Sequence, residues 1–441
     1  MANETRAAVS QPTAGSLATK PALKFLALLY ALAIVGFPLA STLPTVLGVG
    51  SQVVTVPFRL MVIALTGVAL YLCLLRRSSL AIGSAVLLSL ALWLLLLGRM
   101  FLDTVFDPLP GEPGMPVSQY VLLSIGACFL PAIAFLEIPT TATLDLARRL
   151  TEALGAIALA SLLYLGLRGI FDGRIFSRLS TEILNPISVG HLGASVFIVT
   201  LAGLATSRGF AKVLRIGLVV LSLVVVVASV SRGPIVAALL LALLHVLAGQ
   251  VRRGLSMAGL LARVSLIAGA IALSVAAITF IESSTNAQIT SRFYGGFGDA
   301  SSQERMLLFR GAWQLFAEQP WFGRSYVELG LMSYPHNLVL ETLMAAGVVG
   351  LVLLVLVLLG AALAGQRVLL ADARVAWPAL LLLQYLIGLM FSGSLLLDGR
   401  FWAMLFAVLA IDAGMSGARA RAPAAAFRDS APLGAAEPRT T

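Results

Sequence analysis

The sequence predicts an all-α, polytopic integral membrane protein. Of its 441 residues, 59% are hydrophobic and only 11% are charged, and the mean hydropathy is +0.98. Apolar runs long enough to cross a bilayer core as helices recur from one end of the chain to the other. Because backbone polar groups in lipid have to be satisfied within the segment itself, these runs predict helices.

About twelve such segments can be distinguished by length and hydropathy. Their apolar cores cover residues 24–40, 54–75, 80–97, 118–136, 152–167, 186–206, 213–228, 234–248, 264–281, 337–363, 375–391 and 401–415. An even number of crossings places both termini on the same side of the membrane.

The charges between these segments predict the orientation. If the chain starts in the cytoplasm, 19 of its 30 basic residues fall on cytoplasmic segments, including every lysine. The other 11 are arginines and face 11 carboxylates outside. Short basic loops resist translocation, so both termini are predicted to be cytoplasmic. The pI near 10.2 follows from this asymmetry and does not indicate nucleic-acid binding, because no folded basic domain is visible.

The chain is predicted to divide into five regions. Residues 1–20 form a cytoplasmic tail, 21–281 hold transmembrane helices 1–9, and 282–335 form a periplasmic loop with an interfacial helix. Residues 336–415 hold helices 10–12, and 416–441 form a second cytoplasmic tail. Of the earlier outer segments, 168–185 is arginine-rich. The acidic and proline-rich segment 98–117 is interpreted as a plain connector.

Within the long outer loop, residues 303–319 (QERMLLFRGAWQLFAEQ) have the pattern of an amphipathic helix. Its large apolar residues recur at three- and four-residue spacing on one side: Met306, Phe309, Trp313 and Phe316. The segment is too short and too charged to span, so we expect it to lie flat at the membrane interface. It is either a simple cover for the bundle or a lid whose polar side presents Arg310 and Arg305 to a headgroup.

The segment YPHNLVLETLMAAGVVG, residues 334–350, opens the tenth predicted span. Pro335 suits the first turn of a helix that continues without interruption. His336 then lies near a helix N-terminus, whose dipole keeps the imidazole neutral and able to accept a proton. Asn337 and Glu341 share a face. A carboxylate just inside the membrane is costly unless paired, so Glu341 is expected to pair with an outer arginine. The alternative is an interfacial histidine without chemistry.

Arg232 lies in SVSRGP, residues 229–234, a tight turn between two spans with almost no aqueous loop. An arginine held there sits close to the depth of a lipid phosphate. The Arg232 side chain either extends to the lipid headgroups or forms a fixed anion site. The shortness of the turn favours the anion site. A planar guanidinium binds phosphate through two parallel hydrogen bonds, which an ammonium cannot do.

Three blocks of the sequence resemble the bacterial O-antigen ligases and their relatives, the O-antigen polymerases. The first is S-x-S-R-G at residues 229–233, and the second is an arginine followed by P-x-x-G at residues 320–323. The third is H-N-x-x-L-E with G-x-x-G behind it, formed by His336, Asn337, Leu340, Glu341, Gly347 and Gly350.

The helix count and the long outer loop before the histidine helix also fit this resemblance. Two positions depart from it. A second glycine that often follows Gly323 by two residues in relatives is Ser325 here. A tryptophan common four residues after the first arginine is Phe309 here. The first departure concerns the geometry of the loop after Gly323.

The resemblance implies glycosyl transfer at the periplasmic face of the bacterial inner membrane, completing lipopolysaccharide. The donor would be a glycan on undecaprenyl pyrophosphate, and the acceptor a sugar hydroxyl on lipid A–core. Pyrophosphate is a good leaving group, so the reaction needs cations that stabilise its charge and a base for the acceptor proton. The outer segments contain no Asp-x-Asp motif, so we expect a metal-independent, inverting glycosyltransferase without a cofactor. Membrane lipid is a further expected partner, and nucleic acid is not.

His336 is the predicted catalytic base, and Asn337 and Glu341 are predicted to support it. Six arginines are predicted to bind the pyrophosphate, the last three as weaker members of the set: Arg232, Arg310, Arg305, Arg178, Arg174 and Arg324. No residues are predicted to bind a metal.

Three other functions compete with the ligase. The O-antigen polymerase shares the donor and pairs two arginine-rich outer loops, of which the segment from Arg168 to Arg178 could be one. A protein O-oligosaccharyltransferase of the same superfamily would use a protein acceptor. A membrane transporter would be expected to carry ionisable groups at mid-membrane, whereas the charges here crowd the outer third of the spans.

Overall fold

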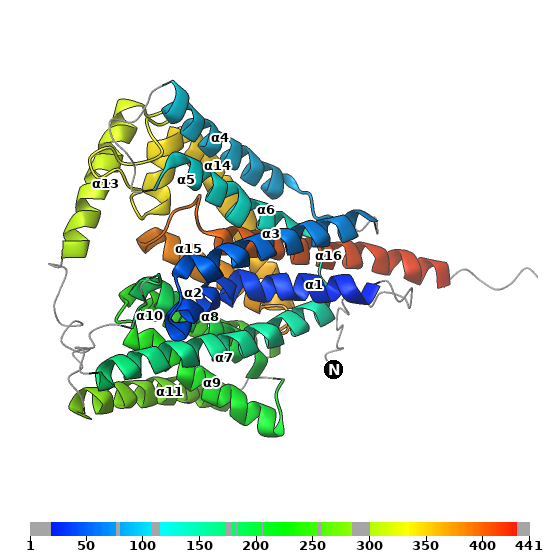
Figure 1. The fold of residues 1–441 in the computed structure, drawn as a ribbon. Helices are drawn as coiled ribbons and strands as arrows, with labels where there is room; N and C mark the ends of the chain where they lie inside the picture. The colour runs from blue at the N-terminus through cyan, green and yellow to red at the C-terminus, as the bar shows by residue number, and fades with distance from the viewer. Residues whose placement is uncertain are drawn as a thin grey trace, which may run out of the picture.

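The computed structural model describes residues 19–75, 80–106, 115–172, 179–181, 183–204, 206–253, 257–284 and 300–429. These residues form helices joined by turns, with two isolated β-bridges and no strand in the described ranges. The predicted all-α class is confirmed. Figure 1 shows long helices running side by side, with α13 (Ala300–Glu318) at one end of the bundle.

The first half of the chain contains the helices α1 (Thr19–Ala31), α2 (Phe37–Leu47), α3 (Ser51–Leu75), α4 (Ser84–Val105), α5 (Val117–Leu122), α6 (Leu130–Ile133), α7 (Thr141–Phe171) and α8 (Pro186–Leu204). The π-helical turn η1 (Leu32–Gly36) joins α1 to α2, and η2 (Leu123–Phe129) joins α5 to α6, which ends in the 3₁₀ turn η3 (Ala134–Leu136). The second half contains α9 (Gly209–Ala228), α10 (Arg232–Arg253), α11 (Met257–Ser284), α13, α14 (Leu338–Ala371), α15 (Trp377–Phe391) and α16 (Gly399–Asp429).

Each of the twelve predicted segments coincides with a helix or a continuous helical run. Among the described residues, ten helices are long and apolar enough to cross a membrane. The remaining two predicted segments correspond to α11 and to α15, which is shorter. For these two helices, spanning stays a prediction. The helix predicted at residues 303–319 is also present, as α13, and its place at the outer membrane interface stays a prediction.

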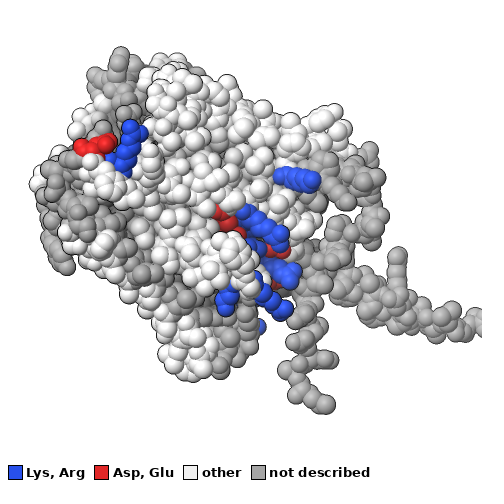
Figure 2. Space-filling view, turned by 60° about the horizontal axis from the view of Figure 1, so that its bottom comes forward, with Lys and Arg blue, Asp and Glu red and all other residues white. Residues whose placement is uncertain are grey.

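The bundle is built around α8, α14, α15 and α16, and the side chains of α8 are almost all buried. α14 packs against α4, α10, α13, α15 and α16, so it connects the core to the end of the bundle where α13 lies. The largest fully buried side chains include Trp93, Trp377 and Trp402. Figure 2 shows basic side chains gathered with acidic ones in one region of the surface, and a smaller charged group well apart from it.

α14 is not the uninterrupted helix that the sequence suggested. It begins at Leu338, two residues beyond His336, and its backbone breaks at Gly347, which has φ 63° and ψ −156°. Pro335 therefore precedes the helix and does not occupy its first turn. A break in a helix leaves backbone N–H and C=O groups without their helical hydrogen bonds, so other groups have to pair with them. Here the loop at residues 320–325 supplies these partners.

Backbone hydrogen bonds join this loop to both sides of the break. The amides of Val348 and Val349 donate to the carbonyls of Pro320 (2.8 Å) and Trp321 (3.2 Å). In the other direction, the Arg324 amide donates to the Met344 carbonyl at 2.8 Å. The P-x-x-G and G-x-x-G blocks of the sequence are therefore two halves of one backbone contact, which keeps an interrupted helix satisfied.

Glycine is required on both sides of this contact. A Cβ at Gly347 would overlap the backbone of Trp321 and lie 2.5 Å from the Pro320 carbonyl oxygen. A Cβ at Gly323, which has φ 71°, would lie 2.5 Å from backbone atoms of Met344, Ala345 and Ala346. Both positions combine a left-handed backbone with a distance that no side chain can occupy.

We expect Gly347→Ala and Gly323→Ala each to destabilise the protein by roughly 2–6 kcal/mol, from about 1–3 for backbone strain and about 1–3 for overpacking. Gly217→Ala on α9 is the matched control, because a methyl group there meets no atom within 4 Å. The measurement is the thermal unfolding midpoint of detergent-purified variants. Equal midpoints for Gly347→Ala and Gly217→Ala would contradict the backbone contact.

Candidate functional site

His336 lies in the turn that leads into α14, where its side chain is half-buried. Its φ of 54° lies in the left-handed region, which is strained for a residue with a side chain. Asn337 holds this turn in place. Its Oδ1 accepts hydrogen bonds from the amides of Val339 and Leu340, both at 3.1 Å, and so caps α14. Its Nδ2 donates to the Met390 carbonyl at 3.0 Å. Asn337 thus ties the His336 turn to the end of α15.

The loop after α15 contacts the imidazole directly. The Gly393 amide donates to His336 Nδ1 over a long distance of 3.4 Å. A neutral imidazole that accepts at Nδ1 carries its own proton on Nε2. Proton uptake by His336 therefore takes place at Nδ1 and displaces the Gly393 amide. The Tyr334 ring packs edge-on against the imidazole, with centroids 4.4 Å apart. Burial raises the pKa of Tyr334 to about 12, so this phenol is not a base near neutral pH.

Glu341 is buried one turn into α14. The prediction that it pairs with an outer arginine is wrong for the residues that the structure describes. In the described part of the chain, its carboxylate accepts hydrogen bonds from the Ser394 hydroxyl at 2.5 Å and the Leu395 amide at 2.8 Å. The Tyr120 hydroxyl lies 3.0 Å from the Ser394 oxygen. Because Ser394 gives its hydrogen to Glu341, Tyr120 donates to Ser394. The Glu341 carboxylate thus anchors Ser394 and Leu395, which directly follow Gly393, the residue that contacts His336.

α13 brings charged residues to the imidazole. The Arg305 guanidinium and the Glu304 carboxylate both act electrostatically on His336. Burial and then Arg305 lower the pKa of His336, while Glu304 raises it by a smaller amount. Burial and the Arg305 cation thus both favour the neutral imidazole, whereas the prediction relied on the helix dipole. That His336 acts as a neutral base stays a prediction.

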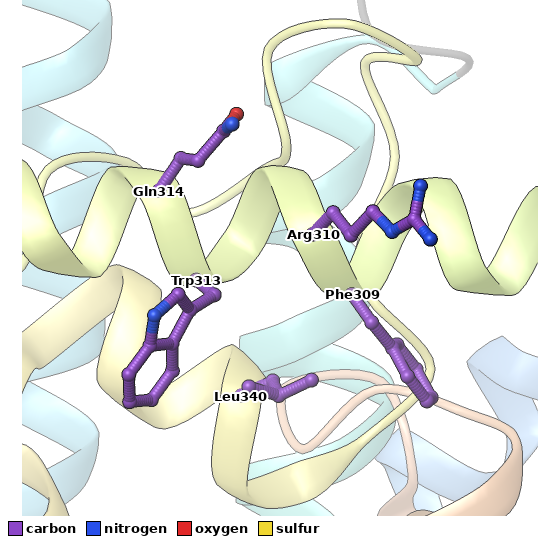
Figure 3. A pocket seen from close by; sticks show the side chains of 5 residues that line it. All are labelled: Phe309, Arg310, Trp313, Gln314 and Leu340. Carbon is purple, nitrogen blue, oxygen red and sulfur yellow. The ribbon is translucent and has the colours of Figure 1, made fainter.

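α13 packs against α14 through a different face from the one carrying the aromatic residues. Leu308, Ala312 and Leu315 are buried, and the last two pack on Met344. Of the predicted row, Met306 and Trp313 are 52% and 55% exposed, while Phe309 and Phe316 are half-buried. Arg310 lines an open groove of about 410 Å³ between α13 and the first turn of α14, together with Phe309, Trp313, Gln314 and Leu340 (Figure 3).

Arg324 lies on the loop at residues 320–325, beside a charged pair on α4 that the sequence interpretation missed. Arg99 Nε lies 3.0 Å from Asp103 Oδ1, and Arg99 also donates to the Gly323 carbonyl at 3.0 Å. Asp103 Oδ2 accepts from the Tyr326 amide at 2.8 Å. Residues 98–105 are therefore the last turns of α4 and fix the loop, so interpreting them as a plain connector was wrong. Two charged residues four apart in an apolar helix were the available signal.

Arg232 is exposed at the first position of α10. The turn before it is held by a hydrogen bond from the Leu179 amide to the Ala228 carbonyl at 2.9 Å, and by a left-handed Val230 with φ 51°. α10 and α13 both lie toward the left of the bundle in Figure 1. Arg232 thus lies on a separate element from Arg305 and Arg310. Arg174 and Arg178 lie outside the described residues.

The pH titration of His336 tests this arrangement. Its pKa is lowered, so we expect the NMR titration midpoint to lie below the ordinary histidine value of about 6.5. Arg305→Gln removes a cation and should raise the midpoint. Glu304→Gln removes an anion and should lower it further. His336→Gln assigns the signal among the three histidines. A wild-type midpoint above the ordinary value, or one unaffected by Arg305→Gln, would contradict the proximity of these groups.

The comparisons with known proteins agree with the resemblance seen in the sequence. Residues 217–355 match the family described as O-antigen ligase. No curated protein and no solved structure matches the chain. The matched stretch contains Arg232, α13, His336 and the break at Gly347. Members of the family are glycosyltransferase-like enzymes. The chain is thus an all-α, polytopic membrane protein in which residues 217–355 are similar to the O-antigen ligase family.

Proposed function

We propose that this protein is an O-antigen ligase, which moves a glycan from undecaprenyl pyrophosphate onto a sugar hydroxyl of lipid A–core at the periplasmic face of the inner membrane. The observation that carries the proposal is the match of residues 217–355 to the O-antigen ligase family, because this stretch contains both Arg305 on α13 and the His336 turn before α14. Transfer from a diphosphate to a hydroxyl needs a cation for the leaving group and a base for the acceptor.

The arginines supply the cationic part of the site. Arg305 and Arg310 are five residues apart on α13, Arg232 begins α10, and Arg324 follows the turn at Gly323. Arg174 and Arg178 complete the proposed set. Guanidinium groups that bridge phosphate oxygens stabilise the charge that develops as the anomeric C–O bond breaks, without a metal ion. Undecaprenyl pyrophosphate leaves as the by-product.

His336 acts as the base in this scheme. The acceptor hydroxyl oxygen bonds to the anomeric carbon as the bond to the diphosphate breaks, and its proton passes to His336 Nδ1 in place of the Gly393 amide. A single displacement of this kind inverts the anomeric centre. Asn337 and Glu341 support the base through the turn and the loop that they hold.

A reconstituted reaction tests the proposal. The protein is placed in liposomes with a glycan on undecaprenyl pyrophosphate and lipid A–core, and the expected product is glycan on lipid A–core. Longer lipid-linked chains would instead indicate the polymerase, and a glycosylated protein acceptor would indicate the oligosaccharyltransferase. Movement of the lipid-linked sugar across the liposome membrane without transfer would replace the proposal by the transporter.

Substitutions separate the proposed roles. His336→Ala should lower kcat about 10²- to 10⁴-fold, because a general base contributes that much, while donor binding is retained. Arg305→Lys should lose much of the activity despite keeping its charge, because an ammonium cannot bridge two phosphate oxygens. Arg374→Lys, an exposed arginine between α14 and α15, is the control and should keep full activity. Wild-type turnover in His336→Ala would remove the proposed base.

A further inference from the structure

The groove between α13 and α14 is a second feature beside the proposed reaction centre. It is lined by Phe309, Arg310, Trp313, Gln314 and Leu340 and has a volume of about 410 Å³, within the range of small-molecule sites. Leu340 lies on the first turn of α14, four residues after His336. A ligand in this groove would therefore contact the first turn of α14, which follows the turn that carries His336.

The aromatic side chains of the groove are not needed to pack α13. That packing uses Leu308, Ala312 and Leu315 on another face of the helix. Trp313 is 55% exposed, so most of its indole is not covered by the rest of the protein and can contact a ligand. Figure 3 shows Trp313 and Phe309, one turn apart, pointing to the side where Leu340 lies. The groove thus has an open aromatic surface on which a flat apolar face can stack.

The rim of the groove is polar. In Figure 3, the Gln314 amide extends from the side of α13 opposite the aromatic pair, and the Arg310 guanidinium extends along the helix. An amide offers both a donor and an acceptor, and a guanidinium offers several donors in one plane. An aromatic floor with a few polar groups at its edge recognises a ligand that has one apolar face and a hydroxyl-bearing perimeter. A pyranose ring has this chemistry.

We propose that this groove is a sugar-binding subsite, in which a pyranose stacks on Trp313 and a hydroxyl bonds to Gln314, while Arg310 at its edge binds the pyrophosphate of the proposed function. The inference rests on the proposed function, which requires a sugar beside His336. The sugar has two possible sources, the glycan of the donor or the core oligosaccharide of the acceptor. A lipid chain fits less well, because the groove is short and carries an amide and a guanidinium at its edge.

Binding of soluble sugars tests the subsite without any turnover. Two probes are used, an oligosaccharide released from the donor glycan and the deacylated core oligosaccharide of the acceptor, and binding is followed by saturation-transfer NMR. One of the two should bind the wild-type protein, which identifies the source. Trp313→Ala should weaken that binding about five- to tenfold, in the range expected for aromatic stacking, and Trp313→Phe should retain most of it. Trp321→Ala is the matched control, because Trp321 is 67% exposed but does not line the groove.

Three outcomes would overturn the subsite: equal binding in wild type and Trp313→Ala, binding of neither oligosaccharide, or Trp313-dependent binding of farnesyl diphosphate that neither oligosaccharide displaces. The last outcome would assign the groove to a lipid chain. Comparing Trp313→Phe with Trp313→Ala guards against misfolding, since a folded Phe variant with wild-type binding shows that the scaffold is intact. The liposome reaction reports on the proposed function separately, so a protein that transfers glycan yet binds no soluble sugar loses only the subsite.

Discussion

The backbone contact between the loop at residues 320–325 and the break in α14 determines the arrangement of the site. Residues 303–318 precede that loop on α13, and His336 and Glu341 lie on the other side of it. Because the loop is bonded to Met344 and Val348, the distance from the end of α13 to the start of α14 is fixed by two glycines. Neither glycine bears a reacting group. They determine where Arg305 and Arg310 lie relative to the imidazole.

Two buried carboxylates are the second feature that fixes the positions of the loops. Each accepts hydrogen bonds from a loop, and Asp103 also pairs with a cation. Glu341 accepts from a hydroxyl and an amide of the loop that contacts His336, and Asp103 accepts from the Tyr326 amide while pairing with Arg99. A carboxylate that receives several hydrogen bonds can be buried at moderate cost. Using carboxylates for loop anchoring leaves the arginines of α13 available for an anionic substrate, which is what the proposed function requires.

The sequence predicted the helices well, because crossing a bilayer imposes a length and an apolar composition that can be recognised locally. α13 was also predictable, since its spacing is helical although its length and charge exclude spanning. The motifs located His336, Arg305 and Gly347, but their connections could not be inferred. Gly347 lies in an apolar run where hydropathy gives no sign of a break, and the positive φ is required only by a loop bonded from elsewhere. The partners of Glu341 are 53 and 54 residues away, and that of Asp103 is 223 residues away. Local patterns contain no information on such contacts.

The pair on α4 has a consequence for how the protein is made. Asp103 reaches its final backbone partner only after more than two hundred further residues have left the ribosome, whereas Arg99 is one turn away on the same helix. During insertion, the nascent segment therefore carries a neutralised carboxylate into the translocon and the lipid. The early helix thus brings its own counter-ion, and the late loop adds a backbone hydrogen bond to an ion pair that persists in the folded protein.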